Sequence, residues 1–251
     1  MSYGILFDST KCIGCEGCMY ACREKNNLPE NEEHTLSARN YTVVKTAGDV
    51  NYRRMCMHCE EPSCASVCPV GALHKTPNGP VVYDAGKCMG CRYCMVACPF
   101  NVPKYTWSKP NPVVSKCVMC YDRIAEGEVP ACADICPTGA TKFGKRDELL
   151  KEAHARLEED PDSYFPYVYG EHEAGGTSVL MLSSIPFAEL GLPVSDEYHN
   201  AFPNYTWKAQ KEIPNVVLLG GTFLYGLWWV INRRMDIENG TLAEPDKKEE
   251  K

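Results

Sequence analysis

The chain has 251 residues, enough for one or two packed domains, and its 44% hydrophobic and 24% charged residues are ordinary for a globular protein. Its net charge of −7 provides no basic surface for phosphates, which excludes nucleic acid as a partner. The unusual number is 16 cysteines, all between Cys12 and Cys136. No basic stretch followed by an apolar run marks a secretory signal at the N-terminus, so we expect synthesis into reducing cytosol, where thiols stay free for metal. A metal-binding framework is therefore favoured over a disulfide scaffold.

The cysteines form four groups of four. In chain order they are Cys12, Cys15, Cys18 and Cys22; Cys56, Cys59, Cys64 and Cys68; Cys88, Cys91, Cys94 and Cys98; and Cys117, Cys120, Cys132 and Cys136. The first and third groups have the bacterial ferredoxin spacing C-x2-C-x2-C-x3-C, in which three cysteines hold one iron–sulfur cubane and the fourth ligates its neighbour. Zinc ribbons use cysteine pairs two at a time across longer loops, which fits this spacing less well. The sequence therefore predicts four [4Fe–4S] clusters rather than zinc sites or disulfides.

Two short signatures each occur twice. DSTKCIGC at 8–15 recurs as DAGKCMGC at 84–91, and CPVGA at 68–72 recurs as CPTGA at 136–140. A two-cluster ferredoxin unit places the C-P-x-G-A half first, then a hairpin, then the D-x-x-K-C-x-G-C half. Groups two and three follow this order, with a hairpin expected over 72–83. Groups four and one are then expected to form the second unit with the chain order reversed.

Exchange of the fourth cysteine within each unit gives the expected ligand sets. In one unit, Cys56, Cys59, Cys64 and Cys98 hold one cluster, and Cys88, Cys91, Cys94 and Cys68 hold its neighbour. In the other unit, the sets are Cys12, Cys15, Cys18 and Cys136, and Cys117, Cys120, Cys132 and Cys22. Spacing alone also permits the pairing of group one with two and three with four. The nested order is the prediction, and the sequential pairing is its alternative.

The second and fourth groups resemble a known family. CMHCEEPSC followed by VCPVGA, and KCVMCYDR followed by PAC, resemble the iron–sulfur subunits of respiratory molybdenum enzymes and hydrogenases. The resemblance covers about residues 1–145 and implies an α+β fold of two ferredoxin-like two-cluster units in nested order, with a linear chain of four clusters. Some relatives carry tryptophan in the third group and hold a three-iron cluster, but Cys91 is present here.

The stretch downstream narrows the resemblance. YGEHEAGGT at 169–177, PF at 186–187 and LGLP at 190–193 are similar to the branch that serves formate dehydrogenases and membrane-bound nickel–iron hydrogenases. That branch ends in a transmembrane helix, and the branch of dimethyl sulfoxide and polysulfide reductases usually does not. The resemblance thus implies a membrane anchor near the C-terminus.

Apolar residues at three-to-four spacing predict an amphipathic helix from Lys145 to Asp160. His154 and His172 have no partner ligands at usable spacing, so we interpret them as solvated or hydrogen-bonded rather than as haem or metal ligands. The same interpretation applies to His58 and His74, because thiolates already fill the nearby sites. Three lysines directly precede cluster cysteines and either tune potentials through their charge or simply lie at the surface: Lys11, Lys87 and Lys116.

Residues 213–232 contain no charge, and twenty helical residues span the hydrocarbon of a bilayer. Trp228 and Trp229 lie near one end, as in interfacial belts. A buried core helix is the alternative, but the polar residues that follow provide no domain to bury it. The expected organisation is a double ferredoxin-like domain at 1–145, a helix and extension packing on it or on a partner at 146–212, a transmembrane helix at 213–232 and a polar charged tail at 233–251.

Positive charge predicts the orientation in the membrane. Only Lys208 and Lys211 lie shortly before the span, whereas five basic residues follow it: Arg233, Arg234, Lys247, Lys248 and Lys251. The positive-inside bias places the tail in the cytoplasm and the cluster domain on the periplasmic face of the cell membrane, as a single-pass protein. The folded domain would then cross the membrane with a partner that carries an export signal.

We find no glycine-rich phosphate loop, no nucleophile with a base and no open metal position in the sequence, so the chain is not expected to be a catalyst. The expected function is electron transfer through four [4Fe–4S] clusters, between a molybdopterin or nickel–iron catalytic subunit of formate dehydrogenase or hydrogenase type and a membrane cytochrome b or quinone-binding subunit. One alternative is the same path from quinol to a molybdopterin terminal reductase. Others are a soluble polyferredoxin that diffuses between partners and a zinc-stabilised interaction module.

Overall fold

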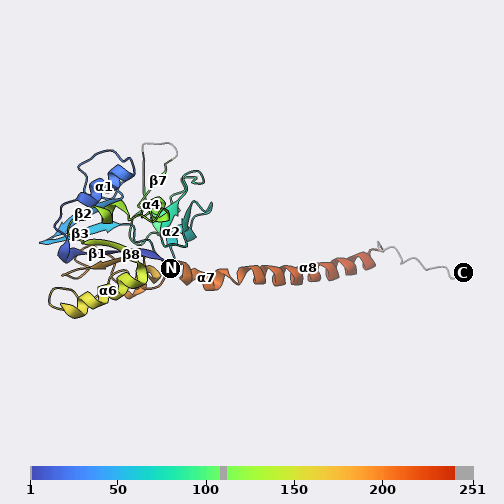
Figure 1. The fold of residues 1–251 in the computed structure, drawn as a ribbon. Helices are drawn as coiled ribbons and strands as arrows, with labels where there is room; N and C mark the ends of the chain where they lie inside the picture. Colours follow the sequence, from blue (N-terminus) through green and yellow to red (C-terminus); the bar gives the residue numbers. More distant parts are fainter. Residues whose placement is uncertain (1, 108–111, 241–251) are drawn as a thin grey trace. The chain divides into compact units, whose positions relative to one another are not determined.

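The structure is a computed structural model that describes residues 2–107 and 112–240 (Figure 1). The chain divides into two units, Met1–Asn204 and Tyr205–Lys251. The first unit contains every cysteine, and its described residues combine helices with four small sheets. The second unit consists of helical residues followed by 241–251, which lie outside the described residues.

A three-stranded sheet forms the base of the first unit, in the order β8 (Thr141–Lys145), β1 (Tyr3–Asp8), β9 (Val179–Leu182). Strand β1 pairs antiparallel with β8 and parallel with β9. Its residues are buried on both sides, because Ile5 and Phe7 face the large core that includes the cysteines and Leu6 faces a smaller one. The sheet therefore separates the cysteine-bearing segments from the opposite face.

Helix α6 (Arg146–Glu159) covers that opposite face, where Leu149 and Ala153 pack on Leu6 (Figure 1). This confirms the amphipathic helix predicted over 145–160. Arg156 reaches from α6 to the buried carboxylate of Asp8 at 2.7 Å, and Tyr164 donates a hydrogen bond to the same carboxylate at 2.9 Å. The helix is thus joined to the end of β1 by a buried ion pair. Removal of one partner of such a pair strongly destabilises the fold, because it leaves an uncompensated buried charge.

Three antiparallel hairpins carry the cysteine loops: β2 (Thr42–Ala47) with β3 (Val50–Met55), β4 (Leu73–Lys75) with β5 (Val81–Tyr83), and β6 (Lys104–Tyr105) with β7 (Val114–Ser115). The second of these is the hairpin predicted over 72–83. Short helices lie within or overlap the cysteine groups: α1 (Gly17–Lys25), α2 (Ser63–Ser66), α3 (Tyr93–Ala97), α4 (Tyr121–Ala125) and α5 (Ala131–Asp134). The described part of this unit also contains three 3-10 turns: Ser9–Lys11, Glu173–Gly175 and Asp196–Tyr198.

The repeated signatures fold alike although their neighbours differ. The amide of Asp84 donates to the carbonyl of Ala72 at 2.8 Å, and the amide of Asp8 donates to that of Ala140 at 2.8 Å. In the C-x-G-C loops, Gly90 has φ +73° and its counterpart Gly14 has φ +71°. Glycine adopts this left-handed conformation without strain, which lets a tight loop turn between two cysteines.

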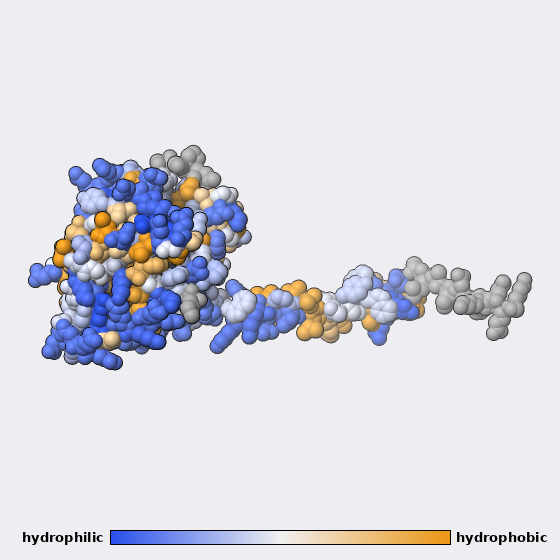
Figure 2. Space-filling view, in the orientation of Figure 1, coloured by the Kyte–Doolittle hydropathy of each residue, from blue (hydrophilic) through white to orange (hydrophobic). Residues whose placement is uncertain are grey.

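The second unit contains the end of α7 (Phe202–Gln210) and the 26-residue helix α8 (Ile213–Glu238). Among the described residues, one helix is long and apolar enough to cross a membrane, over Phe202–Glu238, and it contains the predicted span 213–232. Its large apolar side chains are exposed, and Figure 2 shows them along the helix with polar groups toward both ends. An unburied apolar surface of this size indicates contact with lipid or protein. The tail residues Lys247, Lys248 and Lys251 lie outside the described residues.

Candidate metal centres

All sixteen cysteines carry free thiols. Two cavities are each lined by four of them. The first, which we name the Cys12 site, contains Cys12, Cys15, Cys18 and Cys136. The second, the Cys88 site, contains Cys68, Cys88, Cys91 and Cys94. Each cavity therefore combines three cysteines of one group with the last cysteine of another.

The other eight thiols lie in two buried neighbourhoods. The thiol of Cys59 interacts electrostatically with Cys56, Cys98 and Cys64, and we name these four the Cys56 site. The thiol of Cys22 interacts with Cys132 and Cys120, and that of Cys117 with Cys22 and Cys132; these four are the Cys117 site. Cys117 also interacts with Cys56, so the Cys117 and Cys56 sites are neighbours.

The C-P-x-G-A turns wrap their cysteine in backbone amides. The amide of Ala72 donates to the Cys68 sulfur at 3.2 Å, and the amide of Thr141 donates to the Cys136 sulfur at 3.4 Å. Partial burial raises the pKa of both thiols, but the amide hydrogen bonds outweigh it and hold each pKa below its ordinary value. These turns thus stabilise the thiolate, the form in which cysteine binds metal.

Cys22, Cys64 and Cys98 are more deeply buried than these two cysteines. Burial is the main cause that raises the pKa of Cys22 and Cys64 to about 12 and that of Cys98 to about 11. Metal binding must displace the protons from such thiols, so loading is expected to weaken in acid. The apolar core around them, which includes Met57, Met119 and Phe100, excludes water.

The thiol sites fit iron–sulfur clusters in their donor chemistry. Each provides four thiols, amide donors point at several sulfurs, and the surroundings are apolar. Within residues 2–107 and 112–240, no three His, Cys, Asp or Glu side chains converge to hold one metal ion. Ligands at the corners of a cubane are separated by the width of the cluster, so they do not need to converge as the ligands of a single ion do.

His154, His172 and His74 are paired or exposed, as the sequence indicated, whereas the buried Nε2 of His58 has no hydrogen-bond partner among the described residues. His154 Nε2 lies 3.0 Å from the carboxylate of Glu171, and the side chain of His172 is largely exposed. His74 is exposed at the surface. His58 is buried, and its Nδ1 accepts a hydrogen bond from the amide of Val81 at 2.9 Å. Burial, followed by the charges of Lys116 and Lys75, lowers the pKa of His58 well below its ordinary value.

Sequence reasoning overlooked Arg53 and left Lys116 undecided. Arg53 is 2% exposed and Lys116 4% exposed, and both lie among the thiol sites. By contrast, Lys87, which precedes a cysteine as Lys116 does, is exposed and pairs with Asp84. The spacing of the cysteines does not indicate that Arg53 lies near Cys18 and Cys132, which are distant in the sequence. The β2–β3 hairpin brings Arg53 to that position.

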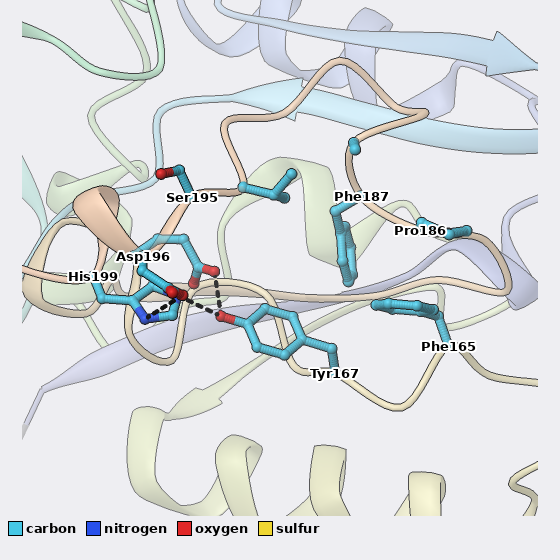
Figure 3. A pocket seen from close by; sticks show the side chains of 10 residues that line it. Phe165, Tyr167, Pro186, Phe187, Ser195, Asp196 and His199 are labelled. Carbon is cyan, nitrogen blue, oxygen red and sulfur yellow. Dashed lines mark hydrogen bonds and ion pairs between the residues drawn. The ribbon is translucent and has the colours of Figure 1, made fainter.

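A cavity of about 230 Å³ lies among residues 165–199, away from the cysteines (Figure 3). Phe165 and Phe187 form an apolar wall, and the hydroxyl of Tyr167 donates to Glu173 at 2.6 Å and lies 3.3 Å from His199 Nε2. Glu173 also accepts from the amide of Gly170. The polar groups of this cavity thus pair with one another.

The thiol sites and the paired cysteine-loop halves define a ferredoxin-type iron–sulfur protein. Residues 50–146 match the family of 4Fe-4S dicluster domains. A protein of Nitratidesulfovibrio vulgaris (strain Hildenborough) is 41% identical over 98% of this chain and 71% of its own length. The Hydrogenase-2 operon protein HybA of Escherichia coli O157:H7 is 39% identical over 89% of this chain and 84% of its own length.

A third relative carries a more explicit description. The iron–sulfur subunit of the nitrate-inducible formate dehydrogenase of Escherichia coli (strain K12) is 35% identical over 70% of this chain and 66% of its own length. The chain belongs to the family of iron–sulfur electron-transfer subunits of respiratory oxidoreductases, as the resemblance in its cysteine motifs implied. It binds [4Fe–4S] clusters and is an electron-transfer subunit rather than a catalytic one.

Proposed function

We propose that the chain holds four [4Fe–4S] clusters in nested order and conducts electrons through them, between a catalytic subunit and a membrane subunit. The observation that carries the proposal is the combination of thiols at each site, three from one group and one from another. The ligands would be Cys12, Cys15, Cys18 and Cys136; Cys117, Cys120, Cys132 and Cys22; Cys56, Cys59, Cys64 and Cys98; and Cys88, Cys91, Cys94 and Cys68.

The pairing of strands supports the nested order over the sequential one. In the unit of groups two and three, β4 and β5 form a hairpin, and Leu73 lies opposite Tyr83. In the unit of groups four and one, β8 and β1 pair in the same sense, and Thr141 lies opposite Phe7. Each strand pair thus joins a C-P-x-G-A turn to a D-x-x-K-C-x-G-C loop, once within one hairpin and once across the length of the domain.

The order of the sites along the electron path follows from their neighbours. The Cys88 and Cys56 sites share one unit, the Cys117 and Cys12 sites share the other, and the interaction of Cys117 with Cys56 joins the two units. When bound, the clusters supply one-electron redox chemistry. The chain contributes thiolates that hold the clusters, amides that stabilise their negative charge and an apolar core that excludes water.

The relatives support a catalytic partner of formate dehydrogenase or hydrogenase type, because two of them are named for these enzymes. The membrane partner would be a cytochrome b or quinone-binding subunit. The exposed apolar helix α8 supports a single-pass anchor in the cell membrane. We propose that the cluster domain lies on the periplasmic face, because more basic residues follow the span than precede it.

We propose the domain boundaries as expected from the sequence, with a double ferredoxin-like domain at 1–145 and a helix and connecting extension at 146–212 that packs on it or on a partner. Pairing of β9 with β1 supports the packing of the extension. The span at 213–232 and the tail at 233–251 would follow.

The experiment that tests the proposal is identification of the subunits that co-purify with the chain after gentle detergent extraction of native membranes. We expect a molybdopterin or nickel–iron catalytic subunit together with a cytochrome b or quinone-binding subunit. If the catalytic subunit is instead a terminal reductase, the electrons would flow in the opposite direction, from quinol to that subunit. Recovery of the chain alone in the aqueous fraction would contradict the proposal in favour of a diffusing polyferredoxin.

A further inference from the structure

Two basic side chains are buried among the thiol sites without an acidic partner. In residues 2–107 and 112–240, neither Arg53 nor Lys116 forms a salt bridge with an aspartate or glutamate. Lys116 donates instead to the carbonyls of Val81 and Cys117. A buried cation is strongly unfavourable unless an opposite charge compensates it. The compensating negative charge must therefore come from the thiol sites themselves.

The guanidinium of Arg53 is fixed from two sides. Its Nε donates to the hydroxyl of Thr42 on β2 at 2.7 Å, and its terminal nitrogen lies 3.4 Å from the hydroxyl of Thr141 on β8. The amide of Thr141 in turn donates to the sulfur of Cys136 in the Cys12 site. These hydrogen bonds hold the guanidinium of Arg53 at a fixed position relative to the Cys12 site, so its charge stays close to that site.

Arg53 lies between two thiol sites. It interacts with Cys18 of the Cys12 site and with Cys132 of the Cys117 site, and its contact with Cys132 includes a side-chain hydrogen bond. Arg53 also interacts electrostatically with Cys22, the cysteine that joins the Cys117 site from the first group.

The two cations show a reciprocal arrangement. Arg53 lies on β3, which leads into Cys56, yet its charge acts on the Cys12 and Cys117 sites. Lys116 directly precedes Cys117, yet its charge acts on Cys64 and Cys98 of the Cys56 site. Each unit therefore receives a buried cation from a segment that leads into a cysteine group of the other unit, group two for Arg53 and group four for Lys116.

We propose that Arg53 is the shared counter-charge of the clusters at the Cys12 and Cys117 sites and raises the reduction potentials of both. The inference rests on the proposed ligand sets. Reduction adds one electron to a centre that is already anionic, so a fixed cation between the two centres stabilises the reduced form of each more than the oxidised form. The electron arrives from the adjacent cluster in the path, and no proton or ligand is exchanged.

Arg53→Gln in the purified complex tests this, because it removes the charge and keeps a polar side chain of similar reach. Potentiometric EPR is expected to show that two of the four clusters become at least about ten-fold harder to reduce at equilibrium, a shift of 59 mV for one electron. The clusters of the Cys12 and Cys117 sites are identified by the EPR signals that disappear in the Cys15→Ala and Cys120→Ala variants, respectively. The other two clusters should keep their potentials.

Arg54→Gln is the matched control. Arg54 is the next residue on the same strand, and it donates to the carbonyls of Gly191 and Phe100 rather than to a thiol. It should leave all four potentials unchanged. Arg53→Lys keeps the charge and should lie close to the wild type. A shift in Arg53→Lys as large as in Arg53→Gln would overturn the proposal, as would unchanged potentials in Arg53→Gln.

Loading is measured separately as iron and sulfide per chain. If Arg53→Gln loses iron from these two sites while Arg53→Lys retains it, the compensating charge is required and the proposal stands. If both variants lose the same clusters while Arg54→Gln loads fully, the guanidinium shape rather than its charge is needed, and the proposal is wrong. Fewer than four clusters in the wild-type chain would instead refute the proposed function.

Discussion

Cys98→Ala is expected to remove the cluster of the Cys56 site, although Cys98 belongs to the third cysteine group. The thiol of Cys98 interacts with those of Cys56 and Cys59, and Cys59 also interacts with Cys64. These four thiols form the Cys56 site. The variant should lose about four irons per chain, the content of one cubane. Because the lost cluster is an inner one in the proposed path, electron transfer from end to end should stop while the catalytic subunit keeps its own half-reaction.

The EPR signals of single-cysteine variants decide between the pairings. Nested order predicts that Cys98→Ala loses the same signal as Cys59→Ala. Sequential pairing, in which group three exchanges with group four, predicts the signal lost in Cys120→Ala. Without any exchange, the lost signal would be that of Cys91→Ala. Either of the last two results would contradict the proposed ligand sets.

Truncation after Glu212 is expected to release the chain from the membrane. We propose that the exposed apolar surface of α8 holds it there, since a spanning helix of this length inserts in effect irreversibly. After alkaline carbonate extraction, which strips peripheral proteins, the full chain should remain in the membrane pellet. The truncated chain should appear in the supernatant with its iron retained.

A truncation after Gly240 is the matched control, because it removes charged residues of the tail but keeps α8 intact. It should stay in the pellet. Release of the full chain by carbonate would contradict the membrane anchor and favour a helix that binds protein instead.

Local patterns made much of the fold predictable. The hairpin over 72–83 follows from two short β-rich runs around a proline and glycine turn, and α6 follows from its apolar period. The repeated signatures also pointed to the pairing of their two halves. Both hairpin and helix depend on residues close together in the chain, which is why the sequence was informative there.

Long-range pairing was less accessible. Strand β9 (Val179–Leu182) joins β1 in parallel across most of the chain, and no local signal in an apolar run specifies such a partner. The burial of Arg53 was also hard to predict from the sequence, because an arginine in an alternating strand normally faces solvent. Lys87 and Lys116 occupy equivalent positions before a cysteine, yet only Lys116 is buried, since the surrounding segments differ.

The most direct test of the central claim is diffraction at the iron absorption edge from crystals of the intact complex. The account predicts four cubane-sized iron peaks in this subunit, with the Cys88 and Cys56 sites in one unit, the Cys117 and Cys12 sites in the other, and the Cys56 and Cys117 peaks adjacent across the boundary. Fewer than four such peaks, single-metal peaks at the thiols, or a path with a different order of sites would contradict it.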